Sequence, residues 1–281
     1  MDRQIVLNRM RRNKFFVIGA IVTVFLVAVT FSSPLYVQFN PMKNALMERL
    51  LPPDTSQGLR GHIFGTDALG RDVFTRLVVG GRFSITISMI IVILQMVMGT
   101  ILGIIAGYVR RVDNFIMRVC DIFLALPNIV LAIAVISVLG PSNTNLIVVL
   151  TISGWVPYCR ILRNNVMVLT QHEFVLASKA FGASHVWIMK EDLFPNVTTP
   201  LIVILSQRVG QTILVEASLS FLNLGIPPPI PSWGNMISDG RQYLATCPWL
   251  IFAPGLALML TALAFNFLGD GIRDVLDPKT L

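Results

Sequence analysis

Apolar residues along the chain gather into six runs that are separated by polar segments. The runs cover approximately residues 15–31, 84–105, 122–138, 145–162, 201–221 and 250–268. Each is close to the roughly 20 residues that a helix needs to cross about 30 Å of hydrocarbon. None alternates as barrel strands do, and lipid offers no hydrogen-bond partner to exposed backbone. The pattern predicts an all-α membrane protein with six transmembrane helices.

Composition supports a lipid bilayer as the surroundings of this chain. Of the 281 residues, 54% are hydrophobic and only 13% are charged, which is unusual for a soluble domain. The first run follows a basic segment, as a signal peptide would. It is longer than a typical signal core, and no small-x-small cleavage pattern follows it. We therefore expect an uncleaved membrane anchor.

Basic residues other than Arg208 are distributed unevenly between the two sides of the membrane that the six runs predict. With a cytoplasmic N-terminus, fourteen fall on the cytoplasmic side: Arg3, Arg9, Arg11, Arg12, Lys14, Arg110, Arg111, Arg118, Arg160, Arg163, Lys179, Lys190, Arg273 and Lys279. Seven fall on the opposite side: Lys43, Arg49, Arg60, Arg71, Arg76, Arg82 and Arg241. Basic flanks resist translocation, so this bias predicts that both termini are cytoplasmic (N-in/C-in). It also accounts for the positive net charge without a nucleic-acid partner.

Catalytic and metal-binding motifs are not recognisable in the sequence. No lysine follows a glycine, which excludes the phosphate loop G-x-x-x-x-G-K-[ST], and no G-x-S-x-G motif is present. The spacing of the histidines is not that of metal ligands: His62, His172 and His185. The cysteines are odd in number and far apart: Cys120, Cys159 and Cys247. We expect a protein that is not an enzyme and binds no metal or cofactor itself.

Residues 171–196, between the fourth and fifth runs, show a helix–turn–helix pattern. The first helix carries residues at helical spacing: Phe174, Ala177, Ser178 and Phe181. Gly182 can end this helix, and a second apolar pattern begins at Val186 and stops at Pro195. On pattern alone, this pair is either a surface that another subunit grips or a hairpin on lipid headgroups.

Four segments resemble the permeases of bacterial ABC importers. Ala177, Gly182 and Pro195 have the spacing of the "EAA" loop of that family, although Leu176, Ser178, Asp192 and Phe194 depart from its pattern. Residues 64–76, FGTDALGRDVFTR, resemble a signature of the peptide/nickel branch. Residues 216–236 and 264–278 are similar to the C-terminal patterns of the same branch, with Asn223 in place of glycine.

The resemblance implies a fold, partners and a function. The fold would be that of a type I ABC-importer permease, with residues 1–83 as an N-terminal segment and residues 84–281 as a five-helix core. The partners would be a homologous second permease, two ATP-binding subunits that carry ATP and Mg, and an extracytoplasmic solute-binding protein. The chain would lie in the bacterial cytoplasmic (inner) membrane and form half of a pathway for di/oligopeptides or a related small solute. Nickel or a metal chelate is an alternative cargo, and a non-transporting membrane scaffold is an alternative of another class.

The resemblance also assigns residues 171–196 as the loop that couples the permease to the ATPase, here called the coupling loop. By the resemblance, Ala177, Gly182 and Pro195 would shape it. From their own chemistry, the small residues Ala177 and Ser178 would allow close approach, and we expect Glu173 and Lys179 to offer polar contacts to the ATPase.

The segment from residue 32 to residue 82 is too long for a simple connector, and we expect it to dock the binding protein or seal the pathway. Gly65, Asp67, Gly70, Arg71 and Asp72 lie within it. Two carboxylates without further oxygen ligands make a poor cation site, so a structural turn is the favoured interpretation.

Polar residues interrupt the fifth run. Arg208, Thr212 and Glu216 follow i, i+4, i+8 spacing with Gln211 alongside, which predicts one polar stripe that lines the pathway or packs against the partner permease. Pro127 and Pro157 are expected to loosen the third and fourth helices locally.

Overall fold

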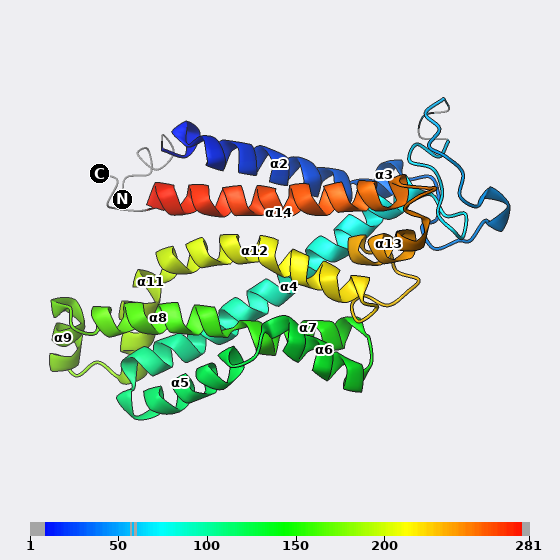
Figure 1. Cartoon of the computed structure of the whole chain (residues 1–281). Helices are drawn as coiled ribbons and strands as arrows, with labels where there is room; N and C mark the ends of the chain where they lie inside the picture. Colours follow the sequence, from blue (N-terminus) through cyan, green and yellow to red (C-terminus); the bar gives the residue numbers. More distant parts are fainter. Residues whose placement is uncertain (1–8, 57, 59–60, 277–281) are drawn as a thin grey trace.

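The computed structural model describes residues 9–56, 58 and 61–276. Arg3, Arg60 and Lys279, which enter the charge count above, lie outside them. Within these ranges the regular elements are helical, and extended backbone meets only at an isolated bridge between Thr66 and Asp72. The longer helices run side by side in an elongated bundle (Figure 1). They are α2 (Lys14–Phe31), α4 (Val73–Tyr108), α5 (Arg110–Leu124), α6 (Asn128–Leu139), α7 (Asn143–Gly154), α8 (Val156–Leu169), α12 (Thr198–Phe221) and α14 (Trp249–Leu276).

Five helical segments are long and apolar enough to cross a membrane, and a bent pair of helices makes a sixth if the pair is counted as one span. The five are α2, α4, α7 with α8, α12 and α14, and they contain five of the six predicted runs. The third run, residues 122–138, is not one continuous helix, because α5 and α6 meet at an angle of 82°. Pro127 directly precedes α6, and a residue before proline is disfavoured in helical conformation. Pro127 therefore accompanies a full break rather than the local loosening that we predicted.

Helix α4 begins well before the run that predicted it. It starts at Val73, where Asp72 caps it by accepting a hydrogen bond from the backbone amide of Thr75 at 2.7 Å. The early turns carry Arg76 and Arg82, so a hydropathy pattern does not include them. The connector that was expected to span residues 32–82 is consequently shorter, with the small helices α3 (Ser33–Tyr36) and η1 (Leu46–Glu48) inside it.

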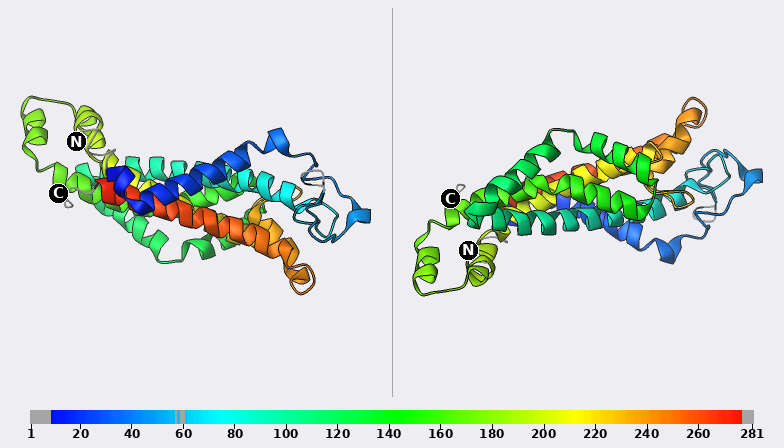
Figure 2. Two further views of the ribbon diagram at one scale, coloured as in Figure 1. Left: turned by 90° about the horizontal axis from the view of Figure 1, so that it is seen from above. Right: turned by 90° about the horizontal axis from the view of Figure 1, so that it is seen from below.

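The two ends of the bundle differ in what they carry. The start of α2, the end of α14 and the segment around α9 (Glu173–Ala180) lie at one end (Figures 1 and 2). The segment between α3 and α4, together with α13 (Trp233–Gly240) and η4 (Arg241–Tyr243), lies at the other. This arrangement matches the side assignment that alternating spans predict for these segments.

Glycines on α4 form a seam against α8. Gly99, Gly103 and Gly107 recur every four residues, and a Cβ atom built on Gly103 would lie 2.7 Å from the carbonyl oxygen of Cys159. At Gly107 a Cβ would lie 2.7 Å from the carbonyl oxygen of Arg163. Small residues at this spacing let two membrane helices approach closely and pack by van der Waals contact. The two backbones can lie this close only because these positions lack side chains.

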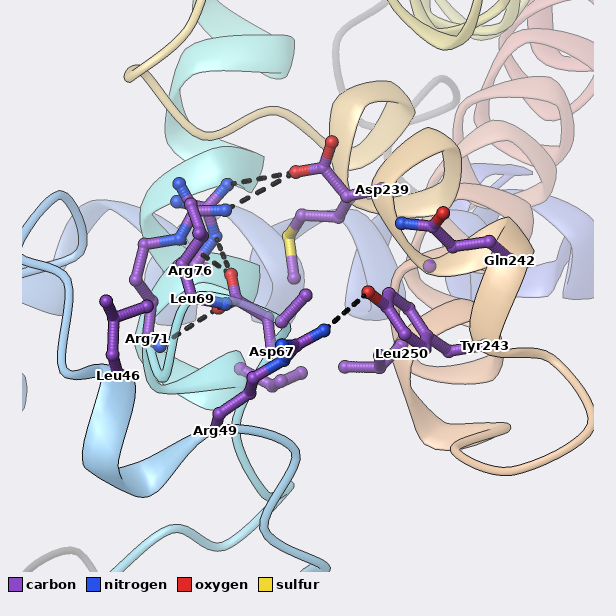
Figure 3. A pocket seen from close by; sticks show the side chains of 14 residues that line it. Leu46, Arg49, Asp67, Leu69, Arg71, Arg76, Asp239, Gln242, Tyr243 and Leu250 are labelled. Carbon is purple, nitrogen blue, oxygen red and sulfur yellow. Dashed lines mark hydrogen bonds and ion pairs between the residues drawn. The ribbon is translucent and has the colours of Figure 1, made fainter.

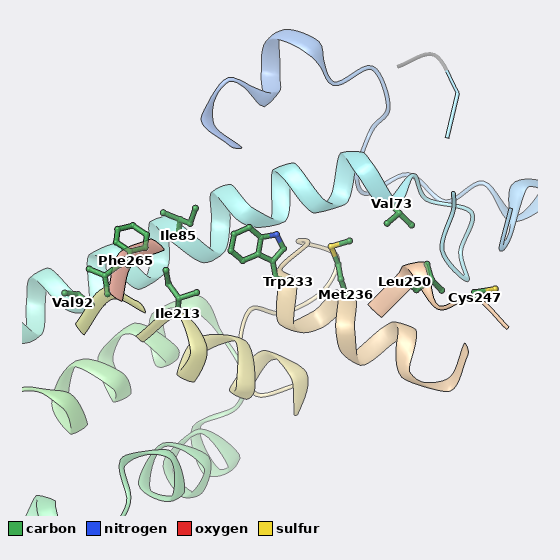
Figure 4. Packing of buried hydrophobic residues seen from close by; sticks show 10 residues of the cluster. Val73, Ile85, Val92, Ile213, Trp233, Met236, Cys247, Leu250 and Phe265 are labelled. Atoms are coloured by element: carbon green, nitrogen blue, oxygen red, sulfur yellow. The ribbon is translucent and has the colours of Figure 1, made fainter. Parts of the chain in front are cut away.

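A buried apolar cluster joins α4 to α12, α13 and α14 (Figure 4). Its members include Val73, Ile85, Ile213, Trp233 and Phe265. The Trp233 ring is 1% exposed, and its Nε1 donates a hydrogen bond to the carbonyl oxygen of Leu77 at 2.9 Å. The short helix α13 is thus packed into the end of the bundle rather than left as a surface loop.

Candidate coupling loop and membrane cavity

The coupling loop folds as a helix, a turn and a second helical segment at one end of the bundle (Figures 1 and 2). After α9, Gly182 has a φ of +81°, a conformation that L-residues with side chains rarely adopt. The amide of Gly182 donates to the carbonyl oxygen of Lys179 at 3.1 Å, and that of Ala183 donates to the carbonyl oxygen of Ser178 at 3.0 Å. These bonds form a Schellman motif, which confirms that Gly182 ends the first helix.

The second helical segment ends at Asn196, one residue beyond the stop that the apolar pattern predicted at Pro195. It comprises α10 (His185–Trp187), a π-helical turn (Ile188–Leu193) and α11 (Phe194–Asn196), and Pro195 lies inside the last of these. The amide of Phe194 donates to the carbonyl oxygen of Met189 across the wide turn. A proline ring normally clashes with the carbonyl one α-turn earlier, and the wider turn before Pro195 relieves that clash.

Buried side chains tie both halves of the coupling loop to the bundle. Val175, Ile188 and Leu193 are each 0% exposed. They belong to one cluster with Leu162 of α8 and Leu201 of α12. Because interiors are close-packed, a displacement of this loop must be shared by the helices it packs against.

Tyr108, the last residue of α4, contacts both halves of the coupling loop. Its hydroxyl lies 2.8 Å from Nδ1 of His185, in the second half. The Lys179 ammonium, in the first half, lies 5.1 Å from the centroid of the Tyr108 ring, within cation–π range. Tyr108 therefore links α4 to residues on either side of Gly182.

The outer surface of the coupling loop combines the predicted residues with exposed apolar side chains. Glu173, Ala177, Lys179, Gly182 and Pro195 are exposed, and Ser178 is half-buried. Large apolar side chains are exposed beside them: Phe174, Leu176, Phe181, Val186 and Trp187. Phe181, next to Gly182, is 91% exposed. Contiguous exposed apolar groups rimmed by polar ones are typical of protein or membrane contacts.

A cavity of about 190 Å³ lies among α4, α6, α7 and α12, and both polar and apolar residues line it. Three residues of the predicted stripe line it: Arg208, Gln211 and Thr212. Gln95 of α4 and Asn128 of α6 also line it. The structure thus gathers polar side chains from three helices at one place within the bundle.

Glu216 does not line this cavity, although the spacing placed it on the same stripe. It is 0% exposed, and its Oε1 accepts a hydrogen bond from the hydroxyl of Ser220 at 2.7 Å. Ser220 in turn accepts a hydrogen bond from the amide of Ile226 at 3.2 Å. Glu216 is therefore part of the packing that holds the turn after α12.

At the opposite end, the signature residues form a hydrogen-bonded turn. Asp67 Oδ1 accepts bonds from the amides of Leu69 at 2.8 Å and Arg71 at 3.0 Å. Gly65 and Gly70 have φ values of +72° and +75°. Asp72 caps α4 and lies 2.9 Å from Nδ1 of His62. In the part of the chain that the structure describes, no cluster of His, Cys, Asp or Glu is suited to a metal ion. These contacts are those of the structural turn.

Two buried arginines connect this turn to α13 around a cavity of about 380 Å³ (Figure 3). Arg71 Nε donates to Asp67 Oδ2 at 2.7 Å, and Nη2 of the same side chain donates to Asp239 at 3.4 Å. The Arg76 guanidinium lies 3.4 Å from Asp67 and 3.9 Å from Asp239. Burial raises the pKa of Asp239, while the two arginines act in the opposite direction. The cluster joins the outer segment to α4 and α13.

Several residues of these sites were not singled out from the sequence. Gln95 and Asn128 are polar residues within or beside apolar runs, which is the signal that identifies them in retrospect. Tyr108 carries no such signal, because it lies outside the apolar runs and finds its partner only through the fold.

Comparisons with known proteins agree with this architecture. A family model described as the N-terminal transmembrane domain of oligopeptide transport permease C matches residues 3–53. A chain of an inward-facing MetNI methionine ABC transporter structure has a similar fold, with a TM-score of 0.56 and 19% identity. The match covers 71% of this chain and 96% of that one.

Relatives of known name align along nearly the whole sequence. A dipeptide transport system permease of Alkalihalophilus pseudofirmus is 39% identical, covering 97% of this chain and 88% of the relative. An oligopeptide permease of Bacillus subtilis is 37% identical, covering 96% and 88%. The nickel permease of Escherichia coli is 39% identical, covering 93% of each. With residues 99–281 also matched by the corresponding family model, the chain belongs to the binding-protein-dependent transport system inner membrane components, the permease subunits of ABC importers.

Proposed function

We propose that this permease forms half of a solute pathway with a homologous second permease and is driven by two ATP-binding subunits that dock on the coupling loop. ATP and Mg would be held by those subunits, and a solute-binding protein would deliver cargo at the opposite end of the bundle. The observation that carries the proposal is a loop with an exposed apolar tip whose buried residues fix it to the helices on both sides. Such a loop can receive a force and pass it into the membrane domain.

The coupling loop suits a protein partner better than lipid headgroups. An interfacial helix lies in the membrane plane with one apolar face downward. Here the loop protrudes at the end of the bundle (Figure 2), and its exposed apolar residues come from both halves around the Gly182 turn. A subunit with a matching groove would cover both halves at once.

We further propose that both termini and the coupling loop are cytoplasmic. The structure groups the start of α2, the end of α14 and the coupling loop at one end. The segments at that end carry most of the basic residues, as cytoplasmic segments do. A cysteine placed at Lys179 should react with a membrane-impermeant maleimide only after the cells are opened, and labelling of intact cells would contradict this orientation.

Peptides or a related small solute are the cargo that we propose. The names of the relatives include dipeptide, oligopeptide and nickel permeases. A metal chelate is the second candidate, because the nickel relative is as similar to this chain as the dipeptide relative is.

The docking proposal is tested by co-purification. Phe181→Ala should lower recovery of the ATP-binding subunits with the tagged permease while leaving recovery of the second permease unchanged. Leu35→Ala is the matched control, because Leu35 is 87% exposed at the opposite end of the bundle. Equal recovery in the wild type and the Phe181 variant would contradict docking at this loop. A complex that assembles without ATP-dependent uptake of any solute would instead favour a scaffold.

A further inference from the structure

The cavity among α4, α6, α7 and α12 contains an arginine that comes from the middle of a predicted membrane-spanning helix. Arg208 is near the middle of the 24-residue helix α12, and it is the only charged residue among those that line the cavity. The other polar groups are neutral amides and hydroxyls, those of Gln95, Asn128 and Gln211 among them. The cavity as described therefore carries a formal charge of +1.

The guanidinium of Arg208 has few partners of its own. Its Nη1 donates a hydrogen bond to Oε1 of Gln211 at 3.1 Å. None of the ion pairs found in the described part of the chain includes Arg208. Glu216, two turns further along α12, is held by Ser220 outside the cavity. A guanidinium presents five N–H donors and cannot be neutralised by losing a proton. The neutral amide of Gln211 does not balance this positive charge, whereas an anion would.

One side chain in the wall of the cavity, that of Gln95, is held in place by the fold. Gln95 Nε2 donates a hydrogen bond to the carbonyl oxygen of Leu150 at 2.7 Å, which holds the amide in place. A Cβ atom at Gly154 would collide with this amide, so Gly154 makes room for it. The volume is smaller than the roughly 300–1,000 Å³ of sites that enclose a drug-sized ligand. The cavity therefore fits one group of a solute rather than a whole solute.

From these observations we propose that the cavity binds the carboxylate of a passing solute through Arg208. A guanidinium binds a carboxylate with two parallel hydrogen bonds, and the interaction is strong where water is sparse. This site rests on the proposed transport function and gives it a substrate class. Peptides with a free C-terminus and metals chelated by carboxylates would be accepted, and a bare divalent cation would be repelled.

The test is the charge preference of a cysteine placed in the cavity. In the assembled importer, with Cys120, Cys159 and Cys247 replaced by serine, Thr212→Cys introduces one thiol beside Arg208. Its reaction rate is measured with an anionic sulfonatoethyl and a cationic trimethylammonioethyl methanethiosulfonate, with and without ATP. We expect the ratio of anionic to cationic rates to fall about tenfold or more when Arg208→Gln is added. Arg208→Lys should keep the higher ratio, because the charge remains.

Each other outcome overturns the proposal. If a carboxylate of the second permease already neutralises Arg208, the ratio will be low before Arg208 is changed and will not respond to Arg208→Gln. If neither reagent reacts in either nucleotide state, water does not reach the cavity and a solute cannot. Failure of the proposed function is recognised separately, because the importer that retains Arg208 would then show no ATP-dependent uptake at all.

Discussion

The turn at Gly182 offers a graded perturbation of the coupling loop. The residue has a φ of +81°, and a Cβ atom placed on it would meet nothing within 4 Å. A substitution therefore adds backbone strain without a steric clash. An L-residue in this left-handed conformation costs about 1–2 kcal/mol, less for asparagine and more for a β-branched residue. The turn would lose about five- to thirty-fold in population with alanine.

The expected consequence is loss of coupling rather than loss of folding. Val175, Ile188 and Leu193 still fasten the two halves of the loop, so the strain falls on the turn between them. In proteoliposomes that contain the whole importer, the amount of solute moved per ATP hydrolysed should decrease in the order wild type, Gly182→Asn, Gly182→Ala, Gly182→Val. Membrane insertion and yield of the permease should be unchanged.

Gly140 provides the matched control. It ends α6 with a φ of +83°, and a Cβ atom there also meets nothing within 4 Å. Gly140, with a ψ of 154°, has a conformation that is open essentially only to glycine, so Gly140→Val adds at least as much backbone strain outside the coupling loop. It should leave the transport ratio unaltered. Normal transport by Gly182→Val with normal recovery of the ATP-binding subunits would refute the reasoning, and so would an equal defect in both variants.

Three further predictions concern other contacts. Tyr108→Phe removes the hydrogen bond to His185 and keeps the ring, so coupling should decrease less than in Tyr108→Leu; uptake equal to that of the wild type in both variants would show that Tyr108 does not position the loop. Gly103→Val forces a side chain against the backbone of Cys159 and should destabilise the protein by about 1–3 kcal/mol, measured as a lower Tm in detergent; an unchanged Tm would argue against the seam. Burial raises the pKa of Asp239, so over part of the acid range the folded protein holds a proton that the unfolded chain has released. The stability of the wild type relative to Asp239→Asn should therefore fall as pH rises through that range. A Tm difference that is constant from about pH 4 to 7 would contradict this sign.

The sequence predicts the positions of the membrane spans more completely than it predicts where their helices bend or begin. Apolarity locates each span because lipid tolerates little else. It does not indicate the direction in which a helix runs, so it could not predict the 82° bend before Asn128. It also misses the first turns of α4, where Arg76 is 3% exposed because protein and not lipid surrounds it. The membrane cavity was predictable in part. Periodicity placed Arg208 and Thr212 on one face, whereas the separation of Glu216 depends on its bond to Ser220.

The glycine seam between α4 and α8 has a mechanical consequence. Helix α4 has 36 residues and is about 54 Å long, well beyond the thickness of the hydrocarbon layer. Near one end of α4, its residue Arg76 pairs with Asp67. At the other end, Tyr108 contacts the coupling loop. Because α4 and α8 pack closely along three glycines, a bend in one helix requires a bend in the other. A tilt of α4 imposed at its coupling-loop end would therefore move its opposite end as well, because Val73–Tyr108 is one continuous helix.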